Sequence, residues 1–306
     1  MLPTRRQVAR ASSGLFRCAT ALGSFGLVIV GLAGASALRA QTIAITDLGT
    51  TFNPITTGHG SLMQDPMNDQ QTGHKSADFV GSSTSVGFQM KLGAFADGVE
   101  MMMFRFTFQE YRTQGFQANL RLGIDADGDG AVDLYFGPNV GGNPQGIFFQ
   151  DPTGGLNVSP STTSLTKDYG GINLVTTGAN ANFSYVDTGV AGAAGELTFA
   201  LPFETLASTL FAQTGIVITP ESFVRFVAFT STQSSSINRD IYGLDGGLSS
   251  TVRFDAPGGG FSDYLDGSGN PVPELSSFVY AAGLLVAGIG LHRRRRRPQR
   301  RPHGHV

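Results

Sequence analysis

The clearest chemistry in this chain of 306 residues lies in DADGDGAVD, from Asp125 to Asp133. Carboxylates at its first, third and fifth positions can converge on one ion only if the chain curls tightly, and Gly130 at the sixth position permits that curl. The backbone carbonyl of the seventh position and the carboxylate of the ninth can complete the ligand set. Such hard oxygen ligands favour Ca²⁺ over a soft metal. The sequence therefore predicts a structural Ca²⁺ site formed by Asp125, Asp127, Asp129, Ala131 and Asp133.

The same stretch departs from an EF-hand at position 12, where Phe136 stands in place of the bidentate glutamate. Its flanks, residues 120–124 and 133–136, have the composition of strands. We therefore expect a modest affinity for Ca²⁺. The alternative is a solvated Asp-Gly hairpin that binds no ion.

A second acidic group comprises Asp65 and Asp69, within Asp-Pro-Met-Asn-Asp, together with Asp78. Asp-Pro and Asn-Asp are also ordinary turn sequences. We favour the turn interpretation for this group.

Short segments rich in β-branched and aromatic residues alternate with Gly, Asn, Asp and Ser clusters through residues 41–254. Residues 204–213 predict a helix, because Leu206, Leu210 and Phe211 fall on one face. This pattern predicts an all-β fold, a single domain like a β-sandwich or jelly roll with one short helix. The candidate strands are 42–46, 86–92, 99–111, 117–124, 132–136, 146–149, 172–176, 183–186, 197–203, 216–219 and 223–230.

The N-terminal 40 residues predict an export signal. Residues 1–17 hold four arginines and no acid, residues 19–37 are apolar and small, and a cleavage site for signal peptidase precedes Gln41. TRRQVAR, residues 4–10, also resembles a twin-arginine signal, although we favour general secretion.

The C-terminal residues predict a short membrane span. Residues 275–291 carry no charge, and a helix of that length reaches roughly 25 Å against a hydrocarbon core of about 30 Å. The cluster Arg293, Arg294, Arg295, Arg296 and Arg297 follows and should remain cytoplasmic. The alternative is a core helix followed by a basic tail that binds nucleic acid. We disfavour it because the arginines directly follow the apolar run.

VPELSSFVYAAGLLVAGIGLHRRRRR resembles the sorting tail of the PEP-CTERM family, with Val272, Pro273 and Glu274 matching its motif and Leu275 replacing the usual second proline. The resemblance implies an exosortase-type sorting enzyme as partner and transient anchoring in the inner membrane. It also implies an exported protein of the envelope, outer surface or extracellular matrix of a Gram-negative bacterium. The expected parts are a signal peptide (1–40), a β-sandwich domain (41–254), a Gly/Ser/Asp linker (255–270) and the sorting signal (271–306).

The body also resembles a group of uncharacterised exported proteins, for which no activity is assigned. The shared blocks are RLGIDADGDGAVDLYFG, GIFFQDPTGGLNVSPSTTS, LTFALPFETL and FVRFVAFTSTQSSSINRDI.

The charge of the body excludes one class of partner. Five of the 21 Lys and Arg lie in residues 1–40 and seven in residues 293–301, so nine remain against 23 acids, a net charge of −14. A body this acidic should repel nucleic acid and attract divalent cations. The only cysteine is Cys18, within the predicted signal, so the mature chain has no disulfide.

Catalytic motifs are scarce. His59 and His74 are the only histidines before the tail, and no GxSxG or HExxH motif accompanies them. We therefore expect a non-catalytic envelope or matrix protein, not an enzyme. A carbohydrate-binding module for matrix polysaccharide is the first alternative, and its candidate aromatic residues are Tyr111, Tyr135, Tyr185 and Tyr242. A glycoside hydrolase or lyase is the second, and it requires two facing carboxylates from among Glu100, Glu110, Glu196, Glu204 and Glu221.

Overall fold

The computed structural model describes residues 45, 52–56, 63–71, 73–95, 97–139, 145–152, 165–178, 180–233, 237, 239–244, 254 and 260–272. The predicted signal peptide, membrane span and arginine cluster lie outside these residues. Within them, no helix is both long enough and apolar enough to cross a membrane.

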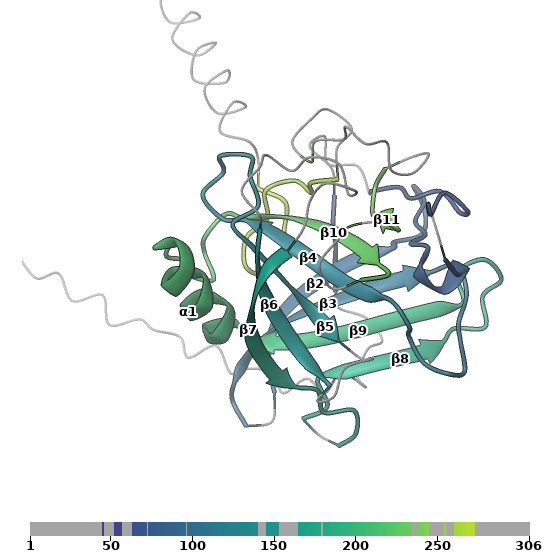
Figure 1. Ribbon diagram of the computed structural model, residues 1–306, viewed down its shortest axis with the longest axis horizontal. Coiled ribbons are helices and arrows are strands. Elements are labelled where there is room, and N and C mark those ends of the chain that lie inside the picture. The colour runs from purple at the N-terminus through teal and green to yellow at the C-terminus, as the bar shows by residue number, and fades with distance from the viewer. Residues whose placement is uncertain are drawn as a thin grey trace, which may run out of the picture. The chain divides into compact units, whose positions relative to one another are not determined.

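Two antiparallel sheets form the described body (Figure 1). The first has five strands in the spatial order β1-β2-β3-β9-β8, and the second has six in the order β11-β10-β4-β5-β6-β7. The first sheet contains β1 (Asn53–Pro54), β2 (Phe88–Ala94), β3 (Glu100–Phe108), β9 (Gly195–Pro202) and β8 (Phe183–Asp187). The second contains β11 (Asp240–Ile241), β10 (Arg225–Ser231), β4 (Asn119–Asp125), β5 (Leu134–Asn139), β6 (Gly146–Pro152) and β7 (Leu165–Asn173).

Strand β3 shows why these segments form sheets. Its side chains point alternately to the two faces, as in any strand. Phe104 and Phe106 enter the main core, whereas Met101 and Met103 join a smaller cluster with Ile45 on the other face. Because both faces are covered, six of its nine residues are apolar.

The two sheets contribute side chains to one common core. The ring of Phe104 in β3 lies 5.6 Å from that of Phe136 in β5 and 5.4 Å from that of Phe226 in β10, measured between centroids. All three side chains are fully buried. Burial of these large rings is a main source of stability in a chain without disulfides.

One α-helix, α1 (Phe203–Thr214), follows β9 directly, and a single 3₁₀ turn, η1 (Lys75–Ala77), precedes β2 among the described residues. Leu206 and Leu210 of α1 are buried in the main core. The helix ends at Gly215, whose φ of 79° allows its N–H to donate to the carbonyl of Phe211 at 2.8 Å.

The predictions of a mainly β body and of one helix at 204–213 are confirmed. The predicted strand at 216–219 is wrong, because those residues pair with no strand among the described residues. They form the connection from α1 toward β10.

Residues 260–272 pack onto the body, which differs from the flexible linker predicted for 255–270. Leu265 is fully buried and exchanges backbone hydrogen bonds with Val224 at 2.9 and 2.7 Å. Asp263 accepts a hydrogen bond from the hydroxyl of Thr56 at 2.8 Å. This segment therefore covers the end of β10 and helps to position the site described next.

Candidate metal centres

The predicted calcium loop joins β4 to β5, with Asp125 as the last residue of β4. Gly128 and Gly130 adopt φ values of 80° and 92°, which side chains other than glycine rarely tolerate. These two positions turn the backbone back on itself. The loop therefore forms between strands, in the tight curl that its sequence predicts.

Three of the predicted ligand residues converge in this loop. Asp125, Asp127 and Asp133 each offer one carboxylate oxygen, and these oxygens lie within 4.8 Å of one another. Two ligands of one Ca²⁺ ion, each 2.3–2.6 Å from it, can be at most about 5 Å apart, so this group could hold a metal ion. Asp129 lies outside the group, and its Oδ1 accepts a hydrogen bond from the N–H of Ala131 at 2.7 Å.

The carboxylate of Asp125 already has several partners. Its Oδ1 accepts from the N–H of Gly128 at 2.8 Å, and its Oδ2 accepts from the N–H of Gly130 at 3.1 Å. The same Oδ2 pairs with Nε of Arg225 at 2.6 Å. The guanidinium of Arg225 in turn lies over the rings of Phe261, at 4.7 Å, and Tyr264, at 5.0 Å. A cation in this loop would share Asp125 with a fixed positive charge.

The ionisation of the loop follows from burial. Burial raises the pKa of Asp125, and the Arg225 guanidinium and the amides of Gly128 and Gly130 partly offset this effect. Burial also raises the pKa of Asp133 to about 6, which the amide of Ala126 opposes and the charge of Asp127 reinforces. The loop therefore binds protons in competition with a cation below about pH 6.

A second acidic group includes Asp65 and Asp69, for which the sequence favoured ordinary turns. Asp65, Asp69 and Asp240, hereafter the buried cluster, each offer one carboxylate oxygen within 4.8 Å of the others. Asp65 and Asp240 are each only 1% exposed, and the fully buried Asp78 lies close enough to influence both. This group too could hold a metal ion. Sequence reasoning missed Asp240, which lies 175 positions after Asp65 and belongs to no motif.

Backbone amides hold the carboxylates of the second group. The contacts are Gly243 N–H to Asp65 Oδ1 at 2.8 Å, Phe79 N–H to Asp240 Oδ2 at 2.7 Å, Asn68 N–H to Asp78 Oδ2 at 2.8 Å and Gln70 N–H to Asp78 Oδ1 at 3.2 Å. These donors come from three separate stretches of chain, at residues 68–70, 79 and 243. The geometry of the group is thus fixed by the fold.

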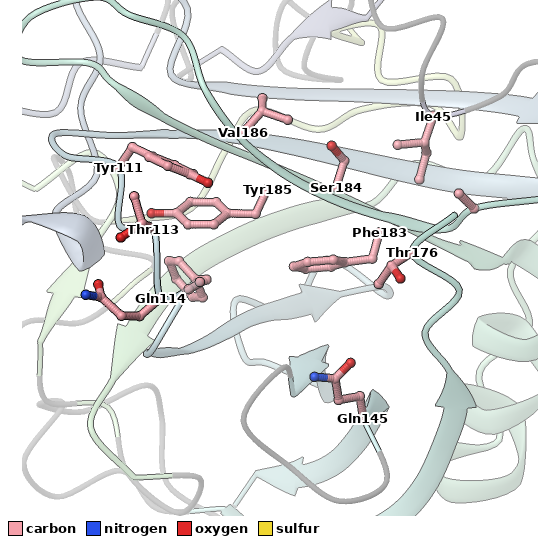
Figure 2. Close-up of a pocket in the computed structure, with 13 residues that line it drawn as sticks. Ile45, Tyr111, Thr113, Gln114, Gln145, Thr176, Phe183, Ser184, Tyr185 and Val186 are labelled. Atoms are coloured by element: carbon pink, nitrogen blue, oxygen red, sulfur yellow. The ribbon is translucent and has the colours of Figure 1, made fainter. Parts of the chain in front are cut away.

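Two of the four candidate tyrosines line a pocket of about 480 Å³ (Figure 2). The rings of Tyr111 and Tyr185 line it, with their centroids 5.0 Å apart. Tyr135 and Tyr242 are buried in the core instead, at 0% and 1% exposure. The polar side chains that line the pocket are Thr113, Gln114, Gln145, Thr176 and Ser184.

The predicted sorting residues lie at the limit of the described chain. The N–H of Val272 donates to the carbonyl of Tyr264 at 2.7 Å, whereas Pro273, Glu274 and the arginines 293–297 lie outside the described residues. Comparison of the chain with protein-family models, curated proteins and solved structures finds no match. What the protein does is therefore inferred from its own residues and geometry.

Proposed function

We propose that this is a non-catalytic exported protein of the cell envelope or extracellular matrix, built as a β-sandwich that Ca²⁺ stabilises. The observation that carries the calcium assignment is the convergence of carboxylate oxygens from Asp125, Asp127 and Asp133 in one tight loop. In the complete site, Asp129 and the carbonyl of Ala131 would turn toward the ion.

The chemistry of the loop supports Ca²⁺ of modest affinity. All its ligands are hard oxygens, which suits Ca²⁺. The Arg225 guanidinium, however, neutralises part of the charge on Asp125, at an Nε to Oδ2 distance of 2.6 Å. A weak site can still be filled outside the cytoplasm, where calcium is abundant.

Thermal unfolding of the full chain, in detergent, tests this assignment. We expect calcium to raise the melting temperature of the wild type, relative to chelator, by more than that of Asp127→Asn with Asp129→Asn. Asp187→Asn is the matched control, because Asp187 is an exposed aspartate of β8 that belongs to neither acidic group. An equal calcium response in the wild type and the double variant would contradict the assignment of the loop as a calcium site.

The two ends of the chain support the location. The predicted signal peptide and the PEP-CTERM-like tail imply processing by signal peptidase and by an exosortase-type enzyme, with transient anchoring through residues 275–291. The net charge of −14 between them opposes binding to nucleic acid. Deletion of residues 273–306 should release the body to the medium. A truncated chain that stays with the membrane would contradict this role for the tail.

A second candidate function is binding of extracellular polysaccharide in the tyrosine pocket. The pair Tyr111 and Tyr185 favours it, because pockets for small molecules combine aromatic surfaces with a few polar groups. The hydroxyl of Tyr185 accepts from the N–H of Arg112 at 3.2 Å and donates to the carbonyl of Glu110 at 3.4 Å, so this ring is held in place.

Affinity electrophoresis in gels that contain bacterial polysaccharides tests the second function. Tyr111→Ala should abolish any retardation that the wild type shows. Tyr169→Ala serves as control, since Tyr169 lies in β7 and does not line the pocket. Migration of the wild type that no polysaccharide alters would contradict this function.

A further inference from the structure

The buried cluster differs from an ordinary group of surface acids in its position. Asp240 comes from β11, an edge strand of the six-stranded sheet. Asp65 comes from the segment before β2, where it forms an antiparallel bridge with Gly81. Oxygens from these two residues and from Asp69 lie within 4.8 Å of one another, a separation that one Ca²⁺ ion at 2.3–2.6 Å can span.

One carboxylate oxygen of this cluster is buried without a hydrogen-bond partner among the described residues. Asp65 is 1% exposed, and its Oδ1 accepts from the N–H of Gly243 at 2.8 Å. Its Oδ2 is buried and has no hydrogen-bond partner in the part of the chain that the structure describes. A buried carboxylate oxygen without a donor loses its hydration, and no hydrogen bond offsets that free-energy cost. Such an oxygen is therefore available to coordinate a cation.

Asp65 and Asp240 have no basic partner among the described residues. Asp78 likewise forms no salt bridge with any described residue. Burial raises the pKa of Asp65 well above its usual range, and the charges of Asp240 and Asp69 raise it further. Burial and the charge of Asp69 likewise raise the pKa of Asp240. Carboxylates gathered in this way require protons or a cation.

The cluster is held in one geometry before any ion binds. Asn68 adopts a left-handed backbone conformation, with a φ of 67°, that is uncommon for residues other than glycine. Its N–H donates to Asp78, and its side-chain oxygen accepts from Nε2 of Gln109 at 3.1 Å. Asp69 follows this turn directly, and one of its carboxylate oxygens lies within 4.8 Å of one from Asp240. The N–H of Phe79 donates to Asp240 Oδ2 at 2.7 Å.

We propose that Asp65, Asp69 and Asp240 form a second site for a hard divalent cation, one that fastens the segment before β2 to the edge strand β11. Oxygen-only ligands select a hard cation, with Ca²⁺ as the probe. The ion links residues far apart in sequence, as a disulfide does in other exported proteins, and Cys18 alone can form no disulfide within the chain. This site does not depend on the loop at Asp125.

The metal content of the full chain tests the proposal. After dialysis against millimolar Ca²⁺ and subtraction of the calcium in the dialysate, elemental analysis should find one ion fewer per chain in Asp65→Asn than in the wild type. The asparagine keeps the acceptor for Gly243 but replaces the unpartnered oxygen. Asp187→Asn should bind as many ions as the wild type. An unchanged ion content in Asp65→Asn would overturn the proposal and indicate a protonated cluster.

A second variant keeps the test valid even if Asp65→Asn fails to fold. Asp127→Asn with Asp129→Asn leaves the buried cluster intact, so this variant should still bind one Ca²⁺ per chain. A folded loop variant that contains no calcium would also overturn the proposal. Failure of the loop assignment alone gives a different result, in which the wild type and the loop variant both bind one ion.

Discussion

The two acidic groups differ in what neutralises them. In the loop, Asp125 is paired with Arg225, while Asp127 and Asp129 are exposed to solvent. In the buried cluster, Asp65 and Asp240 are each 1% exposed and have no basic partner among the described residues. A buried group without a counter-charge gains more from an ion than a solvated group with one. The buried cluster, which no sequence motif marks, is therefore the stronger candidate for cation binding.

Removal of Arg225 should make the loop resemble the buried cluster. In chelator, Arg225→Met should lower the free energy of unfolding by about 3 kcal/mol, because it leaves the buried carboxylate of Asp125 without its partner. Calcium should restore part of that loss. Denaturant titration with calcium and with chelator measures both effects.

Arg105→Met is the control for this variant, because Arg105 pairs with Glu196 at 3.7 Å and belongs to neither acidic group. Calcium should not restore the stability of Arg105→Met. A calcium response of Arg225→Met that equals the wild-type response would break the contrast between the two groups.

Asp65→Asn should remove the larger share of the calcium response. An ion present at 100 times its Kd stabilises the folded state by about 2.7 kcal/mol. In calcium, this variant should lose stabilisation of that order, whereas in chelator it should match or exceed the wild type, since it carries one buried charge fewer. Equal calcium responses in Asp65→Asn and the wild type would reverse the ranking of the two groups.

The stability of the metal-free chain should fall as pH rises. Asp65, Asp240 and Asp133 all have a pKa in the folded state above their usual value, that of Asp133 at about 6. Stability from a raised carboxyl pKa is complete below the unfolded pKa and is lost as pH rises through the folded one. Melting temperatures in chelator should therefore decrease from about pH 4 to pH 7, and calcium should oppose the decrease. A melting temperature that rises with pH over this range in chelator would contradict the raised pKa values of these carboxyl groups.

Asp127→Asn with Asp129→Asn should have the smallest effect. Both side chains are exposed, and calcium at about five times the Kd of a weak site contributes about 1 kcal/mol. The loss should appear only in calcium and should add to that of Asp65→Asn, since the two groups share no residue. Chemical denaturation of both variants and of their combination checks this additivity.

The sequence predicted the local parts of the fold. Strand β3 and helix α1 follow from periodicity, and the tight loop follows from Gly130 within DADGDG. The linker predicted for 255–270 and the strand predicted at 216–219 depended on composition alone. Composition does not reveal that Leu265 pairs with Val224 or that residues 216–219 connect two elements without pairing with a strand.

The two candidate metal sites also differ in whether the sequence could predict them. The loop could be predicted because its candidate ligands lie within nine residues, from Asp125 to Asp133. The buried cluster could not, because Asp65 and Asp240 lie 175 positions apart and come together only through the tertiary fold. Nor does sequence distinguish Tyr185, which lines the pocket, from Tyr242, which is buried.

Isothermal titration calorimetry of the full chain with Ca²⁺ tests most directly whether the buried cluster is the stronger site. We expect two classes of site. The tighter class should disappear in Asp65→Asn, and the weaker class should disappear in Asp127→Asn with Asp129→Asn. A tighter class that persists in Asp65→Asn and disappears in the loop variant would show that the loop is the stronger site.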